Sequence, residues 1–171
     1  MEETEKTLLS KDSAKPEEET IKKISGKILL IDDEKYENEL LKLALLKKNW
    51  DVEVEYFMDP DIALEYLKTT KDEIFLIISD MNMPKITGLE FKKALDNDES
   101  LRYKTIPFIF SSTSEEKSQV VAAYEYRVQG YFKKPNTLDK QAEMLDIIIK
   151  YWIICKHPDQ GDIYKSTNHA T

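Results

Sequence analysis

Acidic residues follow two apolar segments of the chain, at the points where each segment would end as a strand. Asp80 comes directly after Ile74–Ser79, and Asp32 and Asp33 come directly after Lys27–Ile31. Because parallel strands present their carboxyl ends at one edge of a sheet, we expect these carboxylates to lie together. Crowded carboxylates repel one another unless a cation is present, and Mg²⁺ prefers oxygen ligands. The pattern predicts a magnesium site suited to phosphoryl chemistry.

Two later strand ends would add hydroxyl and ammonium groups to the same edge. Ser112 follows the apolar segment that begins at Pro107, and Lys134 follows Gly130–Lys133. A lysine can neutralise a carboxylate and bind phosphate, and a carboxylate held by a metal ion and a lysine is the arrangement for an aspartyl-phosphate. Each residue also has a simpler interpretation by itself. The aspartates and the serine could be turn or capping residues, and the lysine a solvated side chain.

Hydrophobic periodicity predicts the elements that would position these residues. Strands are expected at 27–31, 52–57, 74–79, 107–111 and 130–133, and helices at 34–48, 60–68, 89–96, 114–126 and 138–156. This alternation indicates an α/β fold in which a parallel sheet lies between two layers of helices. A strand order of 2-1-3-4-5, adopted by analogy with other doubly wound sheets, would put the strands that precede Asp32 and Asp80 side by side.

Composition limits the class of protein. A chain of 171 residues suits one domain, expected at 25–158, with a disordered acidic and polar extension at 1–24 and a polar tail at 159–171. The net charge of −8 argues against nucleic-acid binding. Cys155 is the sole cysteine, no signal peptide is apparent, and no apolar segment is long enough to insert in a membrane, so we expect a cytoplasmic protein.

Over residues 27–158 the chain resembles the receiver domain of two-component response regulators. Asp32 and Asp33 resemble the acidic pair of that family, and Asp80 resembles its phosphoacceptor. The resemblance implies that Asp33 binds Mg²⁺ directly and Asp32 through water, while Asp80 and the backbone carbonyl of Asn82 complete the metal site. It also implies a flavodoxin-like (βα)5 fold, a three-layer sandwich around a five-stranded parallel sheet of order 2-1-3-4-5.

Further motifs match the same family at its spacing. Pro84 and Gly88 match the loop that follows the phosphoacceptor. Lys134 and Pro135 match a lysine that holds the phosphoryl group and a proline that is normally joined to it by a cis bond.

Two residues match the switch of the family, and two others depart from its pattern. Ser112 matches the switch hydroxyl, and Tyr131 matches the switch aromatic residue. Thr113 stands where receivers usually have Ala or Gly, which should crowd the phosphoryl group. Arg127 stands where a Gly often ends the fourth helix, and a left-handed Arg127 would carry strain of about 1 kcal/mol.

The resemblance implies a signalling switch and not an enzyme that turns over a separate substrate. A sensor histidine kinase, of a hybrid or phytochrome type among others, would phosphorylate Asp80 in a bacterial cytoplasm. The short segment after Pro158 is too small for a DNA-binding fold, so output is expected through a downstream protein or a phosphotransfer protein. Two alternatives remain: a phosphatase of the haloacid dehalogenase type, which needs Asp-x-Asp on its first strand, and an interaction module independent of phosphorylation.

The last predicted helix is apolar on more than one side. Ile147, Ile148 and Ile149 would point in directions about 100° apart, and the sheet cannot cover all of them. Exposed apolar patches usually mark interfaces. We therefore expect a homodimer or a kinase-docking surface on this helix, with Ile148 and Ile154 as its test positions, unless the N-terminal extension covers it.

Overall fold

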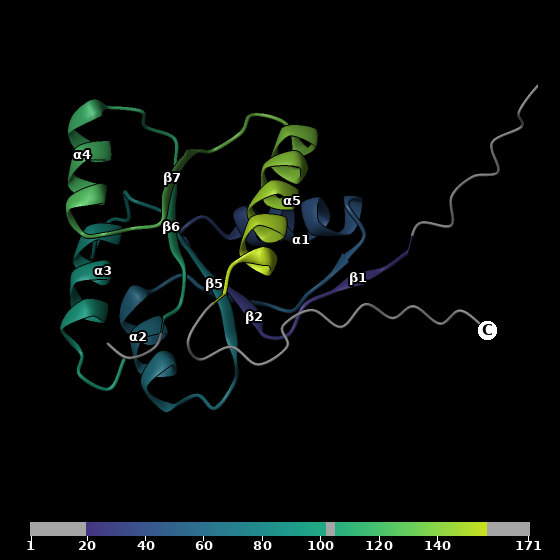
Figure 1. Cartoon of the computed structure of the whole chain (residues 1–171). Coiled ribbons are helices and arrows are strands. Elements are labelled where there is room, and N and C mark those ends of the chain that lie inside the picture. Colours follow the sequence, from purple (N-terminus) through teal and green to yellow (C-terminus); the bar gives the residue numbers. More distant parts are fainter. Residues whose placement is uncertain (1–19, 102–104, 157–171) are drawn as a thin grey trace, which may run out of the picture.

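The fold places one parallel sheet between two layers of helices (Figure 1). The computed structural model describes residues 20–101 and 105–156. The strands are β1 Lys22–Lys23, β2 Lys27–Ile31, β3 Trp50–Asp51, β4 Val54–Phe57, β5 Ile74–Ser79, β6 Phe108–Ser112 and β7 Gly130–Lys133. The helices are α1 Lys35–Lys47, α2 Pro60–Thr69, α3 Gly88–Asn97, α4 Lys117–Glu125 and α5 Leu138–Ile154. No helix within these described ranges is long and apolar enough to cross a membrane.

The main sheet has five parallel strands in the order β4-β2-β5-β6-β7. In terms of the five predicted strands this is the order 2-1-3-4-5, so the predicted fold class is confirmed. The register of the sheet aligns the ends of β2 and β5, because Ile31 of β2 pairs with Ser79 of β5. The residues that follow this pair, Asp32 and Asp80, therefore leave the sheet next to each other.

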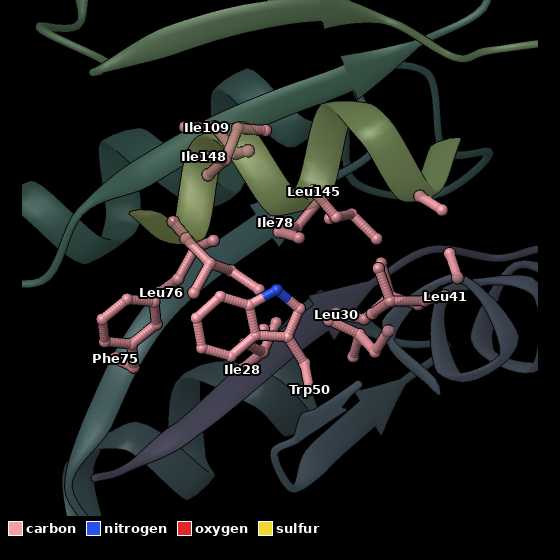
Figure 2. Close-up of a cluster of buried hydrophobic side chains, with 14 residues drawn as sticks. Ile28, Leu30, Leu41, Trp50, Phe75, Leu76, Ile78, Ile109, Leu145 and Ile148 are labelled. Atoms are coloured by element: carbon pink, nitrogen blue, oxygen red, sulfur yellow. The ribbon is translucent and has the colours of Figure 1, made fainter. Parts of the chain in front are cut away.

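Alternating side chains of the central strands pack against different helical layers. Ile28 and Leu30 of β2 belong to a buried cluster with residues of α1 and α5, whereas Leu29 and Ile31 belong to one with residues of α2, α3 and α4. Both faces of β2 and β5 are thus covered, which explains why these strands read as continuous apolar segments. Figure 2 shows the first cluster around Trp50.

A short strand precedes the five that the sequence predicts. The expected extension runs to residue 24, yet Lys22–Lys23 forms β1 and pairs in parallel with Trp50–Asp51 of β3. Lys22 Nζ lies 5.0 Å from the centre of the Trp50 ring and 3.5 Å from Asp146 Oδ1 on α5. Because β1 consists of two lysines, it shows no apolar periodicity, and the sequence pattern does not predict a strand there. Residues 1–19 and the expected tail at 159–171 lie outside the described residues.

Helix α5 buries two of its three consecutive isoleucines. Ile148 is 4% exposed and Ile149 is fully buried, and both belong to the core shared with α1. The prediction that Ile148 lies at an interface is therefore wrong. Its neighbour Ile147 is 67% exposed and Ile154 is 76% exposed, as expected for a helix with more apolar side chains than the sheet can cover.

Candidate functional site

The edge of the sheet formed by the carboxyl ends of β2 and β5 carries the predicted acidic residues. Asp32 and Asp80 are both buried, and Asp33 is half-buried. The backbone N–H of Asp80 donates to the carbonyl of Ile31 at 2.8 Å, which extends the pairing of the two strands to Asp80. Strand register thus holds Asp80 beside the turn that carries Asp32 and Asp33.

Lys134 joins this edge from the end of β7. Its Nζ lies 2.7 Å from Asp32 Oδ2, 3.5 Å from Glu37 Oε1 and 3.7 Å from Asp80 Oδ1. Its backbone N–H donates to the carbonyl of Ser112 at 2.7 Å, which fixes the end of β7 against β6. The predicted meeting of Asp32, Asp80 and Lys134 is therefore present in the fold.

Electrostatics at this edge are dominated by burial. Burial raises the pKa of Asp32 to about 6, although the hydrogen bond from Lys134 opposes the shift. Burial also raises the pKa of Asp80, against the favourable charge of Lys134. Burial alone would lower the pKa of Lys134, but its hydrogen bond to Asp32 and the surrounding carboxylates raise it above its ordinary value. The site thus gathers more acidic groups than its lysine offsets.

The donor set at this edge suits a hard divalent cation in its chemistry. Asp32, Asp33 and Asp80 offer oxygen ligands, and the Asp33 charge raises the pKa of Asp80, a repulsion that a cation would relieve. Within the described residues, no group of three or more His, Cys, Asp or Glu side chains converges as a ready-made metal site. Mg²⁺ commonly takes only one or two carboxylates and keeps several waters, so this donor set fits the ion.

The loop after β5 folds back tightly onto Asp80. The N–H of Asn82 donates to Asp80 Oδ2 at 3.2 Å, and the N–H of Gly88 donates to the carbonyl of Met81 at 3.0 Å. A Cβ atom on Gly88 would lie 2.2 Å from the backbone oxygen of Asp80. Pro84 lies in this loop before α3 begins at Gly88. Pro84 therefore lies in the predicted loop, and Gly88 lies at its end as the first residue of α3.

The predicted switch residues lie next to this loop. Ser112 is fully buried at the end of β6, and its Oγ accepts a hydrogen bond from Asn82 Nδ2 at 3.3 Å. The hydroxyl of Tyr131 on β7 donates to the carbonyl of Ser114 at 2.8 Å. The Tyr131 ring lies 6.4 Å from the ring of Phe110, centre to centre. A chain of contacts therefore connects Asp80 through Asn82 and Ser112 to the segment that Tyr131 holds.

The structure also shows the conformation of the residues that depart from the family pattern and of the bond before Pro135. Thr113 is exposed and lines a cavity of about 370 Å³ together with Lys134. Arg127 has a φ of 54°, so it adopts the left-handed conformation in which a residue other than glycine carries strain. The expected cis bond before Pro135 is absent: the described residues contain no cis peptide bond. The trans form is the favoured one for most X–Pro bonds.

Two residues of the site were missed by the sequence reasoning. Glu37 of α1 is only 9% exposed and lies beside Lys134. Tyr56 of β4 donates its hydroxyl to the carbonyl of Asp32 at 2.8 Å and so braces the acidic turn. Neither residue has a signal in the sequence: Glu37 is an acidic residue in the first turn of a helix, and Tyr56 is an aromatic residue in a strand.

Comparisons with known proteins agree with this geometry. Residues 28–146 match the family described as the response regulator receiver domain. The chain is 29% identical over 125 residues to the chemotaxis protein CheY1 of Helicobacter pylori, covering 72% of this chain and 96% of that protein. The phosphorylated cyanobacterial phytochrome response regulator RcpA aligns with a TM-score of 0.67 at 27% identity, covering 76% and 95% of the two chains. The Mn²⁺-bound form of the response regulator Rcp1 aligns with a TM-score of 0.64 at 26% identity, covering 77% and 97%.

Proposed function

The chain belongs to the response regulator receiver domain family, and we propose that it is a phosphoacceptor switch that takes a phosphoryl group onto Asp80 from a histidine kinase. The position of Lys134, within 3.7 Å of Asp80 and 2.7 Å of Asp32 at one strand edge, carries this proposal. A haloacid dehalogenase phosphatase would need Asp-x-Asp on β2, and the adjacent pair Asp32 and Asp33 lacks that spacing.

Phosphoryl transfer at this edge would use groups that already lie around Asp80. A carboxylate oxygen of Asp80 attacks the phosphorus of a phosphohistidine, the new P–O bond forms as the P–N bond breaks, and the imidazole leaves. Lys134 offsets the added negative charge as a point charge. The N–H of Asn82 already donates to Asp80 Oδ2 and favours the ionised carboxylate that attacks. Hydrolysis later releases phosphate and restores Asp80, so no separate substrate is turned over.

Mg²⁺ is the cofactor that we assign to the acidic edge. Asp33 and Asp80 would hold it directly, Asp32 through water, and Asn82 through its backbone carbonyl. When bound, the ion would neutralise anionic oxygens of the phosphoryl group. The family relationship and the all-oxygen donor set support the assignment, as does the likeness to Rcp1, a response regulator whose structure has been solved with Mn²⁺.

The contacts of Ser112 and Tyr131 suggest how phosphorylation would be signalled to a partner protein. In our proposal the Ser112 hydroxyl moves to the phosphoryl oxygens and Tyr131 turns into the space behind it. The surface of α4, β7 and α5 then changes shape, so that a local charge change biases a bistable element. A downstream protein would read this surface, or a phosphotransfer protein would take the phosphoryl group onward.

The kinase partner and the cellular setting are also proposals. The likeness to the phytochrome response regulator RcpA favours a phytochrome-type or other hybrid sensor kinase as the phosphoryl donor. We place the protein in a bacterial cytoplasm. The net charge of −8 makes nucleic acid an unsuitable partner.

An exposed apolar stripe on α5 supports self-association. Ile147, Tyr151 and Ile154 are 67%, 56% and 76% exposed. Their spacing of four and three residues puts them on one side of the helix. We propose that this stripe, rather than the buried Ile148, forms an isologous homodimer.

Labelling with acetyl phosphate and Mg²⁺, followed by intact-mass measurement, tests the central proposal. We expect one phosphoryl group on the wild type, none on Asp80→Asn, and one on the control Asp51→Asn, which alters an exposed carboxylate on β3. Calorimetric titration with Mg²⁺ should give a larger loss of affinity for Asp33→Ala than for Asp32→Ala. Equal labelling of Asp80→Asn and the wild type would reject Asp80 as the phosphoacceptor.

A further inference from the structure

Glu37 is a buried carboxylate that none of the steps above uses. It lies in the first turn of α1, where the positive end of the helix dipole favours an acidic residue. That placement would account for an exposed glutamate, but Glu37 is only 9% exposed. A buried carboxylate is costly unless it has a cationic or hydrogen-bonding partner. Lys134, whose Nζ lies 3.5 Å from Glu37 Oε1, supplies one.

Lys134 is shared among three carboxylates, and Asp80 is the most distant of them. Nζ lies 2.7 Å from Asp32, 3.5 Å from Glu37 and 3.7 Å from Asp80. The side chains of Lys134 and Glu37 are 10% and 11% exposed, so solvent screens their attraction only weakly. Glu37 therefore competes with Asp80 for the ammonium group of Lys134.

We propose that Glu37 is a positioning residue that restrains Lys134 and sets the charge of the site. Its negative charge slows phosphoryl uptake by Asp80 and strengthens the binding of a divalent cation at the acidic edge. The statement about uptake rests on the proposed function, whereas the statement about cation binding depends only on the charges at this edge.

The two effects have opposite signs for a physical reason. A phosphodonor is an anion, so each additional carboxylate near Asp80 repels it, and each carboxylate that holds Lys134 delays the move of the lysine to the phosphoryl oxygens. A divalent cation is attracted by the same negative charge. Replacing the carboxylate by an amide of the same shape should therefore make phosphorylation faster and cation binding weaker.

Glu37→Gln and Glu37→Asp, with Glu39→Gln as the matched control, test this inference. Glu39 is on the same helix, and its substitution makes the same charge change at an exposed position. At saturating Mg²⁺, the rate constant for labelling by acetyl phosphate should rise roughly three- to tenfold in Glu37→Gln. The Mg²⁺ dissociation constant of the unphosphorylated protein, measured by calorimetry, should rise by a similar factor. Glu37→Asp should keep Mg²⁺ affinity near that of the wild type, and Glu39→Gln should change neither quantity.

The other outcomes are also decisive. Unchanged rate and affinity in Glu37→Gln, with a lower melting temperature alone, would reduce Glu37 to a structural residue and overturn the inference. A slower rate would overturn it too, because Glu37 would then hold Lys134 in its productive position. If the wild type takes no label, the proposed function fails, and an unchanged Mg²⁺ affinity in Glu37→Gln would separately reject the charge effect.

Discussion

Gly88 lies so close to Asp80 that no side chain fits between them. A Cβ atom on Gly88 would lie 2.2 Å from the backbone oxygen of Asp80 and 2.6 Å from the ring of Phe110. Gly88 is also the first residue of α3. A capping box formed by Thr87 and Glu90 stabilises the start of this helix. The start of α3 therefore holds the backbone of Asp80, the proposed phosphoacceptor, by direct contact, and there is no room for a side chain at residue 88.

Gly88→Ala should destabilise the protein and impair labelling. The added methyl group has to displace the backbone of Asp80, which should lower the free energy of unfolding by about 1–3 kcal/mol. Urea denaturation measures this change, and acetyl phosphate labelling should be slower even where the protein remains folded. The control Lys93→Ala alters an exposed residue of the same helix and should change both quantities little. Wild-type stability in Gly88→Ala would contradict the close contact.

The site residues that lie directly after a strand could be predicted from the sequence. Ile74–Ser79 is entirely buried and reads as a strand, so the position of Asp80 after it follows from the pattern. Glu37 could not be assigned in the same way. Its contact with Lys134 depends on how α1 lies over the sheet edge, and a glutamate near the start of a helix is ordinary.

Tertiary contacts also decide the two elements of the fold that differ from the sequence prediction. Three consecutive isoleucines on α5 do not reveal which side faces the sheet, so Ile148 was assigned to an interface although it lies in the core. Strand β1 was missed because Lys22 and Lys23 are held by pairing with β3 and by contacts to Trp50 and Asp146. Such tertiary contacts leave no local pattern.

Thr113→Ala should shorten the lifetime of the phosphorylated protein. Thr113 follows Ser112, the proposed switch residue, and lines the cavity of about 370 Å³ beside Lys134. Its branched side chain should obstruct a water that approaches the aspartyl-phosphate in line. The loss of label after removal of acetyl phosphate, followed by mass measurement, should be faster in Thr113→Ala. The conservative change Thr113→Val should keep a lifetime near that of the wild type, and a longer lifetime in Thr113→Ala would reject the steric explanation.

Asp146 should contribute stability that depends on pH. Burial alone would raise the pKa of Asp146, but hydrogen bonds from Lys150 and Trp50 and the charge of Lys22 hold it below its ordinary value. A carboxyl with a lowered pKa in the folded state stabilises that state above its unfolded pKa, near 4, and loses the contribution as the pH falls through the folded value. Asp146→Asn should therefore lower the free energy of unfolding by about 1–2 kcal/mol at pH 7 and by less at pH 3.5.

Urea denaturation at the two pH values measures this difference. The control Asp139→Asn removes an exposed partner of Lys47, whose pair should contribute no more than about 1 kcal/mol. A loss of stability in Asp146→Asn that is as large at pH 3.5 as at pH 7 would show that the carboxylate charge is not the cause.

The exposed stripe of α5 should control the oligomeric state. Ile147 and Ile154 are exposed on α5. Ile148 packs into the core, where Figure 2 labels it. In sedimentation velocity we expect a dimer of the wild type, strengthened by beryllofluoride, and a monomer of the double variant Ile147→Glu, Ile154→Glu, because a charge on this stripe cannot be buried at low cost. The control Ile62→Glu places one such charge on a similarly exposed isoleucine of α2 and should leave the dimer intact. A wild type that stays monomeric at high micromolar concentration, with and without beryllofluoride, would reject the dimer.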